Sequence, residues 1–145
     1  MSVEENKVVT RRFFDEIVSR GNLDVLNELV NQDFYEHNPP LPGIPQGREG
    51  LKMTVNGLRT GFPDLRVTIE DLVAEGEKVM VLLRFQGTHR GTFMGVPATG
   101  KPVKWTVMQL LRFENGKFRE RWLQSDIQSS MQHLVASPPP GQNPG

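Results

Sequence analysis

The dipeptide Asn115–Gly116 is the feature that most restricts how this chain can fold, because it lies between two long segments rich in strand-forming residues. Asn-Gly is typical of a two-residue type I′ turn, in which both central residues take positive φ. The segments 103–113 and 119–126 are therefore predicted to form an antiparallel hairpin. The turn also sets the register, in which Phe113 faces Phe118 and side chains alternate between the two faces of the sheet.

This register, continued along the hairpin, places several polar side chains on one face together with both tryptophans. Trp105 would face Asp126, and Gln109 would face Trp122, with Gln124 between them. A carboxylate among indole and aliphatic groups loses solvation, which strengthens it as a base. Asp126 is therefore expected to exchange protons near neutral pH, while the glutamine amides hold a carbonyl or enol oxygen. The alternative is that Asp126 only caps the helix predicted to follow it.

The rest of the chain divides into a helical first part and a strand-rich second part. Apolar residues recur at helical spacing over 9–18, and shorter amphipathic patterns follow. Later segments alternate around turn residues, as strands do. Helices followed by antiparallel strands are typical of an α+β fold. The predicted helices are 9–18, 23–30, 48–60 and a closing segment at 127–135; the other predicted strands are 34–37, 65–73 and 78–88.

Length and proline distribution indicate the domain organisation. A chain of 145 residues is typical of one domain. Prolines cluster in the segment 37–45, which lies between patterned segments and is predicted to be an ordered loop. They cluster again in 137–145, which has few apolar side chains and is predicted to be a disordered tail. We therefore expect one α+β domain over residues 1–136.

Composition excludes several classes of function. The 17 basic and 17 acidic residues balance, which is atypical of a nucleic-acid-binding protein. The absence of cysteine removes disulfides, thiol nucleophiles and cysteine-based metal sites. No apolar run is long enough to span a membrane, and the acidic start does not resemble a signal peptide. A cytoplasmic protein with no nucleic-acid or membrane partner is expected.

Several segments together resemble the SnoaL-like polyketide cyclases of the nuclear transport factor 2-like superfamily. The glycine-rich run 87–101 and the turn 112–117 are followed by Glu120, Trp122 and Asp126 at a family-like spacing. Segments 35–38 and 62–64 also fit, so the likeness covers residues 5–135.

The resemblance implies a fold and an activity. The fold is a cone-shaped barrel of N-terminal helices packed on a strongly curved antiparallel sheet around a deep pocket. In the characterised cyclases, one pocket aspartate acts as general acid and base in the intramolecular aldol closure of a polyketide ester, without metal or organic cofactor. That aspartate corresponds by position to Asp126, and Gln109, His37 and Asn38 correspond to other pocket groups. The resemblance also implies a small hydrophobic carbonyl-containing substrate and a homodimer.

The candidate site follows from both arguments. Asp126, Gln109 and His37 are the predicted catalytic residues. His89 is a candidate pocket group, although its position favours a structural role in anchoring the glycine-rich loop. A metal site formed by His37, His89 and Asp126 is set aside because no close ligand spacing supports it. The predicted substrate-binding residues are Asn38, Tyr35, His89, Trp105, Trp122 and Gln124.

Two functions from different classes remain open from the sequence. The first is a cofactor-free cyclase or isomerase that removes a proton beside a carbonyl group. The second is a non-catalytic module that binds a small apolar molecule in the same cavity, and a scaffold domain with an unused pocket is a weaker third. A buried unpaired acid gives a pure binding pocket no advantage, which favours the enzyme.

Overall fold

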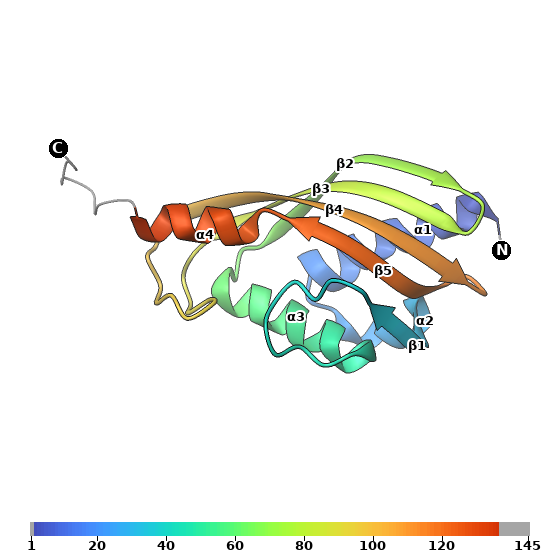
Figure 1. Cartoon of the computed structure of the whole chain (residues 1–145), viewed down its shortest axis with the longest axis horizontal. Coiled ribbons are helices and arrows are strands. Elements are labelled where there is room, and N and C mark those ends of the chain that lie inside the picture. The colour runs from blue at the N-terminus through green and yellow to red at the C-terminus, as the bar shows by residue number, and fades with distance from the viewer. Residues whose placement is uncertain (1, 137–145) are drawn as a thin grey trace.

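The computed structural model of the chain describes residues 2–136, and the predicted tail at 137–145 lies outside the described residues. The described chain consists of helices followed by a long, curved five-stranded sheet (Figure 1). The predicted α+β fold, with N-terminal helices packed on a strongly curved sheet, is confirmed.

The N-terminal helix changes its winding halfway along. The α-helix α1 (Val3–Arg12) begins with the Ser2 hydroxyl accepting a hydrogen bond from the backbone N–H of Glu5, and it continues directly into the π-helical segment η1 (Phe13–Ser19). Single-turn π segments are frequent at functional sites. The buried residues of η1 are Phe13, Phe14, Ile17 and Val18. The next two helical segments are short: η2 (Leu23–Val25) and α2 (Leu26–Leu29).

The sheet has the strand order β1-β5-β4-β3-β2. Four strands form the predicted antiparallel meander, but β1 pairs in parallel with β5, so the prediction of a wholly antiparallel sheet is wrong at this edge. Hairpin turns force their strands to be antiparallel, whereas β1 is joined to the sheet through helices and is free of that constraint. The strands are β1 (Val30–Glu36), β2 (Arg66–Glu75), β3 (Lys78–Thr88), β4 (Pro102–Glu114) and β5 (Lys117–Ser125).

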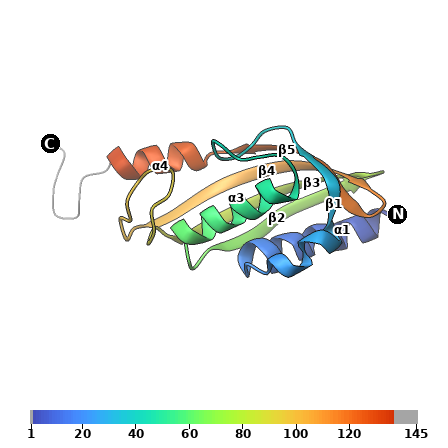
Figure 2. The ribbon, with the colours of Figure 1, turned by 90° about the horizontal axis from the view of Figure 1, so that it is seen from below.

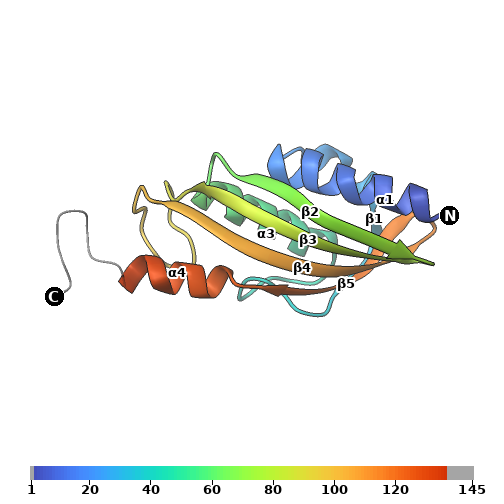
Figure 3. The same ribbon diagram turned by 90° about the horizontal axis from the view of Figure 1, so that it is seen from above.

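The helices cover one face of this sheet, which we call the inner face. Figure 2 shows α1 and α3 (Gly47–Gly61) in front of the strands, and Figure 3 shows the opposite, outer face without a covering helix. Alternate residues of β3 and β4 are buried toward the helices, as period-two patterning requires. The outer face exposes Tyr35, Val73, Met80 and Met108. The homodimer that the family resemblance implies stays a prediction.

Two further segments complete the molecule. The proline-rich loop folds back onto the start of α3, where Gly50 lies so close to the carbonyl oxygen of Pro45 that no β-carbon would fit. The closing helix α4 (Ile127–Ala136) packs beside the beginning of β4 (Figure 1). Within residues 2–136, no helix is long and apolar enough to cross a lipid bilayer.

Candidate functional site

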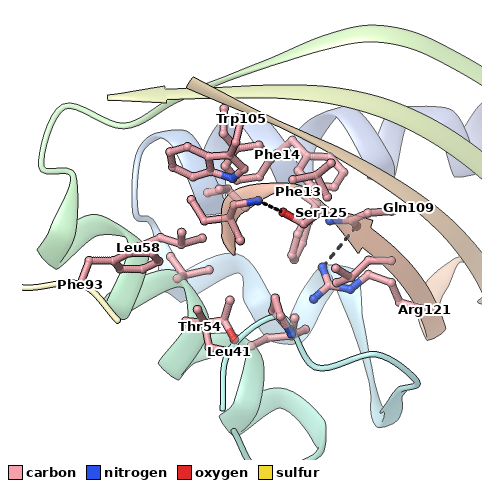
Figure 4. A pocket seen from close by; sticks show the side chains of 18 residues that line it. Phe13, Phe14, Leu41, Thr54, Leu58, Phe93, Trp105, Gln109, Arg121 and Ser125 are labelled. Carbon is pink, nitrogen blue, oxygen red and sulfur yellow. Dashed lines mark hydrogen bonds between the residues drawn. The ribbon is translucent and has the colours of Figure 1, made fainter. Parts of the chain in front are cut away.

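A pocket lies between the inner face of the sheet and the helices η1 and α3 (Figure 4). Its cavity volume is about 50 Å³, and the atom-free space is about 570 Å³ when the open mouth is counted. The proline-rich loop forms one wall through Pro40 and Leu41, and α3 contributes Leu51, Val55 and Leu58. Most of the lining is apolar, which is typical of small-molecule sites. The aromatic side chains of the lining are Phe13, Phe14, Phe85, Phe93 and Trp105.

Two buried polar side chains stand out against this apolar lining. Gln109 and Arg121 are each only 4% exposed, and the guanidinium Nη1 of Arg121 donates a hydrogen bond to Oε1 of Gln109 at 3.3 Å (Figure 4). Since the carbonyl oxygen of Gln109 must face the cationic donor, the amide nitrogen at the other end of the group is directed away from Arg121. The pair therefore offers N–H donors, and no carboxylate among the described residues lines this pocket.

Glu36 lies immediately behind this pair. Nε of Arg121 donates to Oε2 of Glu36 at 2.7 Å, and both side chains are almost completely buried. The guanidinium also lies over the ring of Phe34, 5.8 Å from its centroid. Burial raises the pKa of the Glu36 carboxyl, and the charge of Arg121 only partly offsets this effect. Three side chains from β1, β4 and β5 therefore form one buried polar cluster, Glu36–Arg121–Gln109.

The predicted hairpin register holds only next to the turn. Asn115 and Gly116 have φ values of 53° and 77°, as a type I′ turn requires, and Phe113 faces Phe118 as predicted. The register then shifts by one residue, because Arg119 is an extra residue on β5 and Arg112 pairs with Glu120. This bulge reverses the faces of the rest of β5.

The reversal moves Arg121 into the pocket, a residue that the sequence argument placed on the outer face and left without function. One signal for it exists in the sequence. Phe118 and Leu123 are both apolar but an odd number of residues apart, so they share the inner face only if the strand contains a bulge. Trp122 obscured this signal, because it is also apolar and lies an even number of residues from Phe118. A strand without a bulge would therefore place Trp122 and Phe118 on the same face.

Seven of the nine predicted site residues do not line the pocket, and four of the seven lie toward the outer face of the sheet. Trp122 is on the outer face, where its ring stacks on His37 with centroids 4.2 Å apart, and Tyr35 contacts His37 edge-on. Nε2 of His37 lies 3.3 Å from a carboxylate oxygen of Glu120. The prediction that these aromatic groups line the pocket is wrong, because the bulge turns Trp122 outward and alternation along β1 turns Tyr35 outward. Gln124 is likewise turned away from the pocket.

Asp126 is exposed, so its predicted desolvation is wrong. Its Oδ1 accepts a hydrogen bond from the backbone N–H of Thr106 at 2.6 Å, and its backbone oxygen accepts the N–H of Ser130 in the first turn of α4. The first N–H of the helix, at Ile127, is instead capped by the hydroxyl of Ser125 (Figure 4). Asp126 therefore joins the end of β5 to β4 and precedes α4, but the hydroxyl of Ser125 and not the Asp126 carboxylate caps the helix, so the capping alternative is wrong as well.

The other predicted residues are distributed over three places. Trp105 is 4% exposed and lines the pocket, as predicted. Asn38 and Gln124 line an open groove next to the pocket, and the two share five lining residues: Pro40, Leu41, Leu123, Ser125 and Ile127. His89 is fully buried away from the pocket; its Nδ1 lies 3.0 Å from the hydroxyl of Thr99 in the glycine-rich loop, which matches the structural alternative.

The three candidate metal ligands do not come together. His37 is on the outer face, His89 is buried beside the glycine-rich loop, and Asp126 is at the exposed end of β5. Over residues 2–136, no group of three histidine, aspartate or glutamate side chains is arranged to hold a metal ion.

Comparison with known proteins gives the geometry a context. The model of the family described as SnoaL-like polyketide cyclase matches residues 8–134. The aklanonic acid methyl ester cyclase DauD of Streptomyces sp. (strain C5) is 32% identical over 98 residues, which are 66% of this chain and 58% of the relative. The chain thus spans less than two thirds of that protein.

A second relative and a solved structure extend the likeness. The nogalonic acid methyl ester cyclase of Streptomyces nogalater is 25% identical over 116 residues, covering 79% of this chain and 86% of the relative. The crystal structure of a putative polyketide cyclase from Bacillus cereus ATCC 10987 superposes with a TM-score of 0.79 at 30% identity, covering 90% of this chain and 80% of that one.

Proposed function

Because the chain belongs to the SnoaL-like polyketide cyclase family, we propose that it is an enzyme that transforms a small carbonyl-containing molecule in the pocket between η1, α3 and the sheet. The observation that carries this proposal is the placement of Arg121 and Gln109 at the only strongly polar part of an otherwise apolar pocket lining within residues 2–136. Apolar walls match the chemistry of an apolar ring system, and N–H donors match a carbonyl oxygen.

The chemistry that suits this arrangement is proton transfer beside a carbonyl group. Loss of an α-proton leaves negative charge on the carbonyl oxygen, and hydrogen-bond donors already oriented toward that oxygen lower the cost of the charge. Arg121 supplies a full positive charge and Gln109 a neutral amide. The resulting enolate carbon would attack a second carbonyl of the same molecule, forming a carbon–carbon bond and an alkoxide that takes back one proton. The sum is an intramolecular aldol closure.

The acid/base role of Asp126 stays a prediction, and the proposed chemistry does not depend on it. Its carboxylate is exposed to solvent, does not line the pocket, and uses Oδ1 on the N–H of Thr106.

Exchange of α-protons for deuterium tests the proposal without knowledge of the natural substrate. An apolar ketone such as 2-tetralone and a set of aromatic β-keto esters would be followed by NMR in D2O, with the buffer rate subtracted. We expect the protein to accelerate exchange, and Gln109→Leu to reduce the acceleration at least about 10-fold by removing one donor. Gln132→Leu, the same change at an exposed position of α4 outside the pocket, should leave the rate within about two-fold. Exchange no faster than in buffer for every probe would contradict the proposal.

A non-catalytic binding module is the second candidate, and one observation favours it. No carboxylate among the described residues lines the main pocket, so the pocket by itself has no obvious base. The same probes separate the two functions. A binding module would bind 2-tetralone, measured by a change in Trp105 fluorescence, and would leave its exchange rate unchanged.

A further inference from the structure

Glu36 is the one buried carboxylate among residues 2–136, with 5% of its surface exposed. Only one of its two oxygens has a protein partner. Oε2 accepts the hydrogen bond from Arg121, whereas Oε1 is buried without any hydrogen bond from the described chain. Buried carboxylate oxygens are normally satisfied, so an oxygen left free in this way needs an explanation.

A small cavity lies beside this carboxylate. Its wall includes Glu36, Arg121, Thr54 and Leu51, and it has room for about one water molecule. Arg121, Thr54, Leu51 and Pro40 also line the main pocket. The cavity and the pocket therefore adjoin, and Glu36 lies beside the part of the lining that they share.

We propose that Glu36 is the proton-accepting group of this site and that it acts on the bound molecule through one water molecule held in the small cavity. This inference rests on the proposed function and supplies the base that the main pocket lacks. General bases act over hydrogen-bond distance or through one water. The free Oε1 provides the acceptor, and the cavity meets the pocket at Thr54 and Arg121.

Every proton that moves in this step has a named donor and acceptor. The water takes the α-proton of the carbonyl compound while it gives one of its own protons to Oε1 of Glu36. The electron pair of the C–H bond becomes the enolate, whose oxygen is held by Arg121 and Gln109. After the carbon–carbon bond forms, protonated Glu36 returns its proton through the same water to the new alkoxide. Glu36 and the water end as they began.

The electrostatics of the cluster suit this role. Burial makes the Glu36 carboxylate a stronger base than an exposed glutamate, and Arg121 keeps it ionised enough to accept a proton. As the proton moves to Glu36, negative charge moves to the enolate oxygen on the other side of Arg121. The guanidinium therefore remains paired with one negative charge throughout, and no net charge is created in the buried site.

The decisive variant is Glu36→Gln, which preserves the size of the side chain and an oxygen for Arg121 but cannot accept a proton. In the D2O assay with 2-tetralone we expect a loss of at least about 100-fold in exchange rate, with the dissociation constant unchanged within about three-fold. The wild-type rate should rise with pH as Glu36 ionises, and this rise should be absent in the variant. A structural role alone would not remove the pH dependence.

Further variants keep the proposal falsifiable if Glu36→Gln folds poorly. Glu36→Ala opens the site, and added formate should restore part of the lost rate by replacing the carboxylate. Glu70→Gln, the same change at an exposed glutamate of β2 outside the pocket lining, is the matched control and should retain exchange within about two-fold. Asp126→Asn tests the alternative base. Full activity of Glu36→Gln, or loss of activity in Asp126→Asn with Glu36→Gln unaffected, would overturn the assignment to Glu36.

Failure of the proposed function gives a different result. If the wild-type protein does not accelerate exchange of any probe, the function itself fails before any variant is compared. If the wild type accelerates exchange and Glu36→Gln does so equally, with the same pH dependence, only the role of Glu36 fails.

Discussion

Two glutamate–arginine pairs lie on opposite faces of the same sheet, and their closest contacts have the same length. On the inner face, Nε of Arg121 is 2.7 Å from Glu36; on the outer face, Nε of Arg112 is 2.7 Å from Glu120. The two glutamates nevertheless respond in opposite ways. Burial raises the pKa of Glu36, whereas the hydrogen bond from Arg112 lowers the pKa of Glu120.

The difference comes from solvation rather than from contact geometry. The side chains of the inner pair are 5% and 6% exposed, so their charges have lost nearly all hydration. The side chains of the outer pair are 26% and 22% exposed, and His37 adds a second partner for Glu120. Desolvation can exceed the Coulombic gain of a buried pair, while an exposed pair loses little hydration. The same contact therefore carries a large desolvation cost on the inner face and a small one on the outer face.

Removing the arginine of each pair should give the largest contrast. Arg121→Met leaves the Glu36 charge buried without a partner, and we expect a loss of about 3–5 kcal/mol in the free energy of unfolding. Arg112→Met leaves Glu120 near solvent and His37, and should cost less than about 1 kcal/mol. Urea denaturation at neutral pH measures both. Equal costs would contradict the asymmetry between the faces.

Removal of the two carboxylates, one at a time, should change the pH dependence of the free energy of unfolding in opposite directions. The raised pKa of Glu36 means that the folded state holds this proton more tightly, so its contribution falls as pH rises above the unfolded value of about 4.3. The lowered pKa of Glu120 means that its contribution is present above that value and is lost as pH falls through the folded pKa.

Unfolding measurements from pH 4 to pH 8 test this pair of signs. Relative to wild type, Glu36→Gln should become more stable as pH rises, whereas Glu120→Gln should become less stable. Slopes of the same sign for the two variants would show that the two carboxylates share one environment.

The two tryptophans give the smallest and simplest test, because one lies on each face. Trp105 is 4% exposed in the pocket wall, and Trp122 is half-buried on the outer face against His37. Each single-tryptophan variant reports on one indole. Acrylamide should quench the fluorescence of Trp122 in Trp105→Phe more strongly than the fluorescence of Trp105 in Trp122→Phe. A ligand in the pocket should change the emission of Trp105 alone. Equal quenching would place both indoles in one environment, as the unbulged register predicted.

Local patterns in the sequence were sufficient for most of the fold. Apolar spacing predicted the first helix, alternation predicted the four long strands, and Asn115–Gly116 predicted the last turn, whose positive φ values the structure confirms. Trp105 and Gln109 were placed correctly because β4 is regular along its whole length. Such features depend on residues that are neighbours along the chain or across one turn.

The composition of the site was decided by tertiary structure. Side chains alternate along a strand, so one extra residue reverses the faces of all residues after it. The extra residue Arg119 therefore turns Arg121 into the pocket in place of Trp122 and leaves Asp126 exposed to solvent. Glu36 became the partner of Arg121 only because β1 adds in parallel to the edge of β5. The sequence by itself therefore determined the elements and the hairpin. Packing between distant segments determined which charges lose water, since desolvation depends on everything that surrounds a group in space.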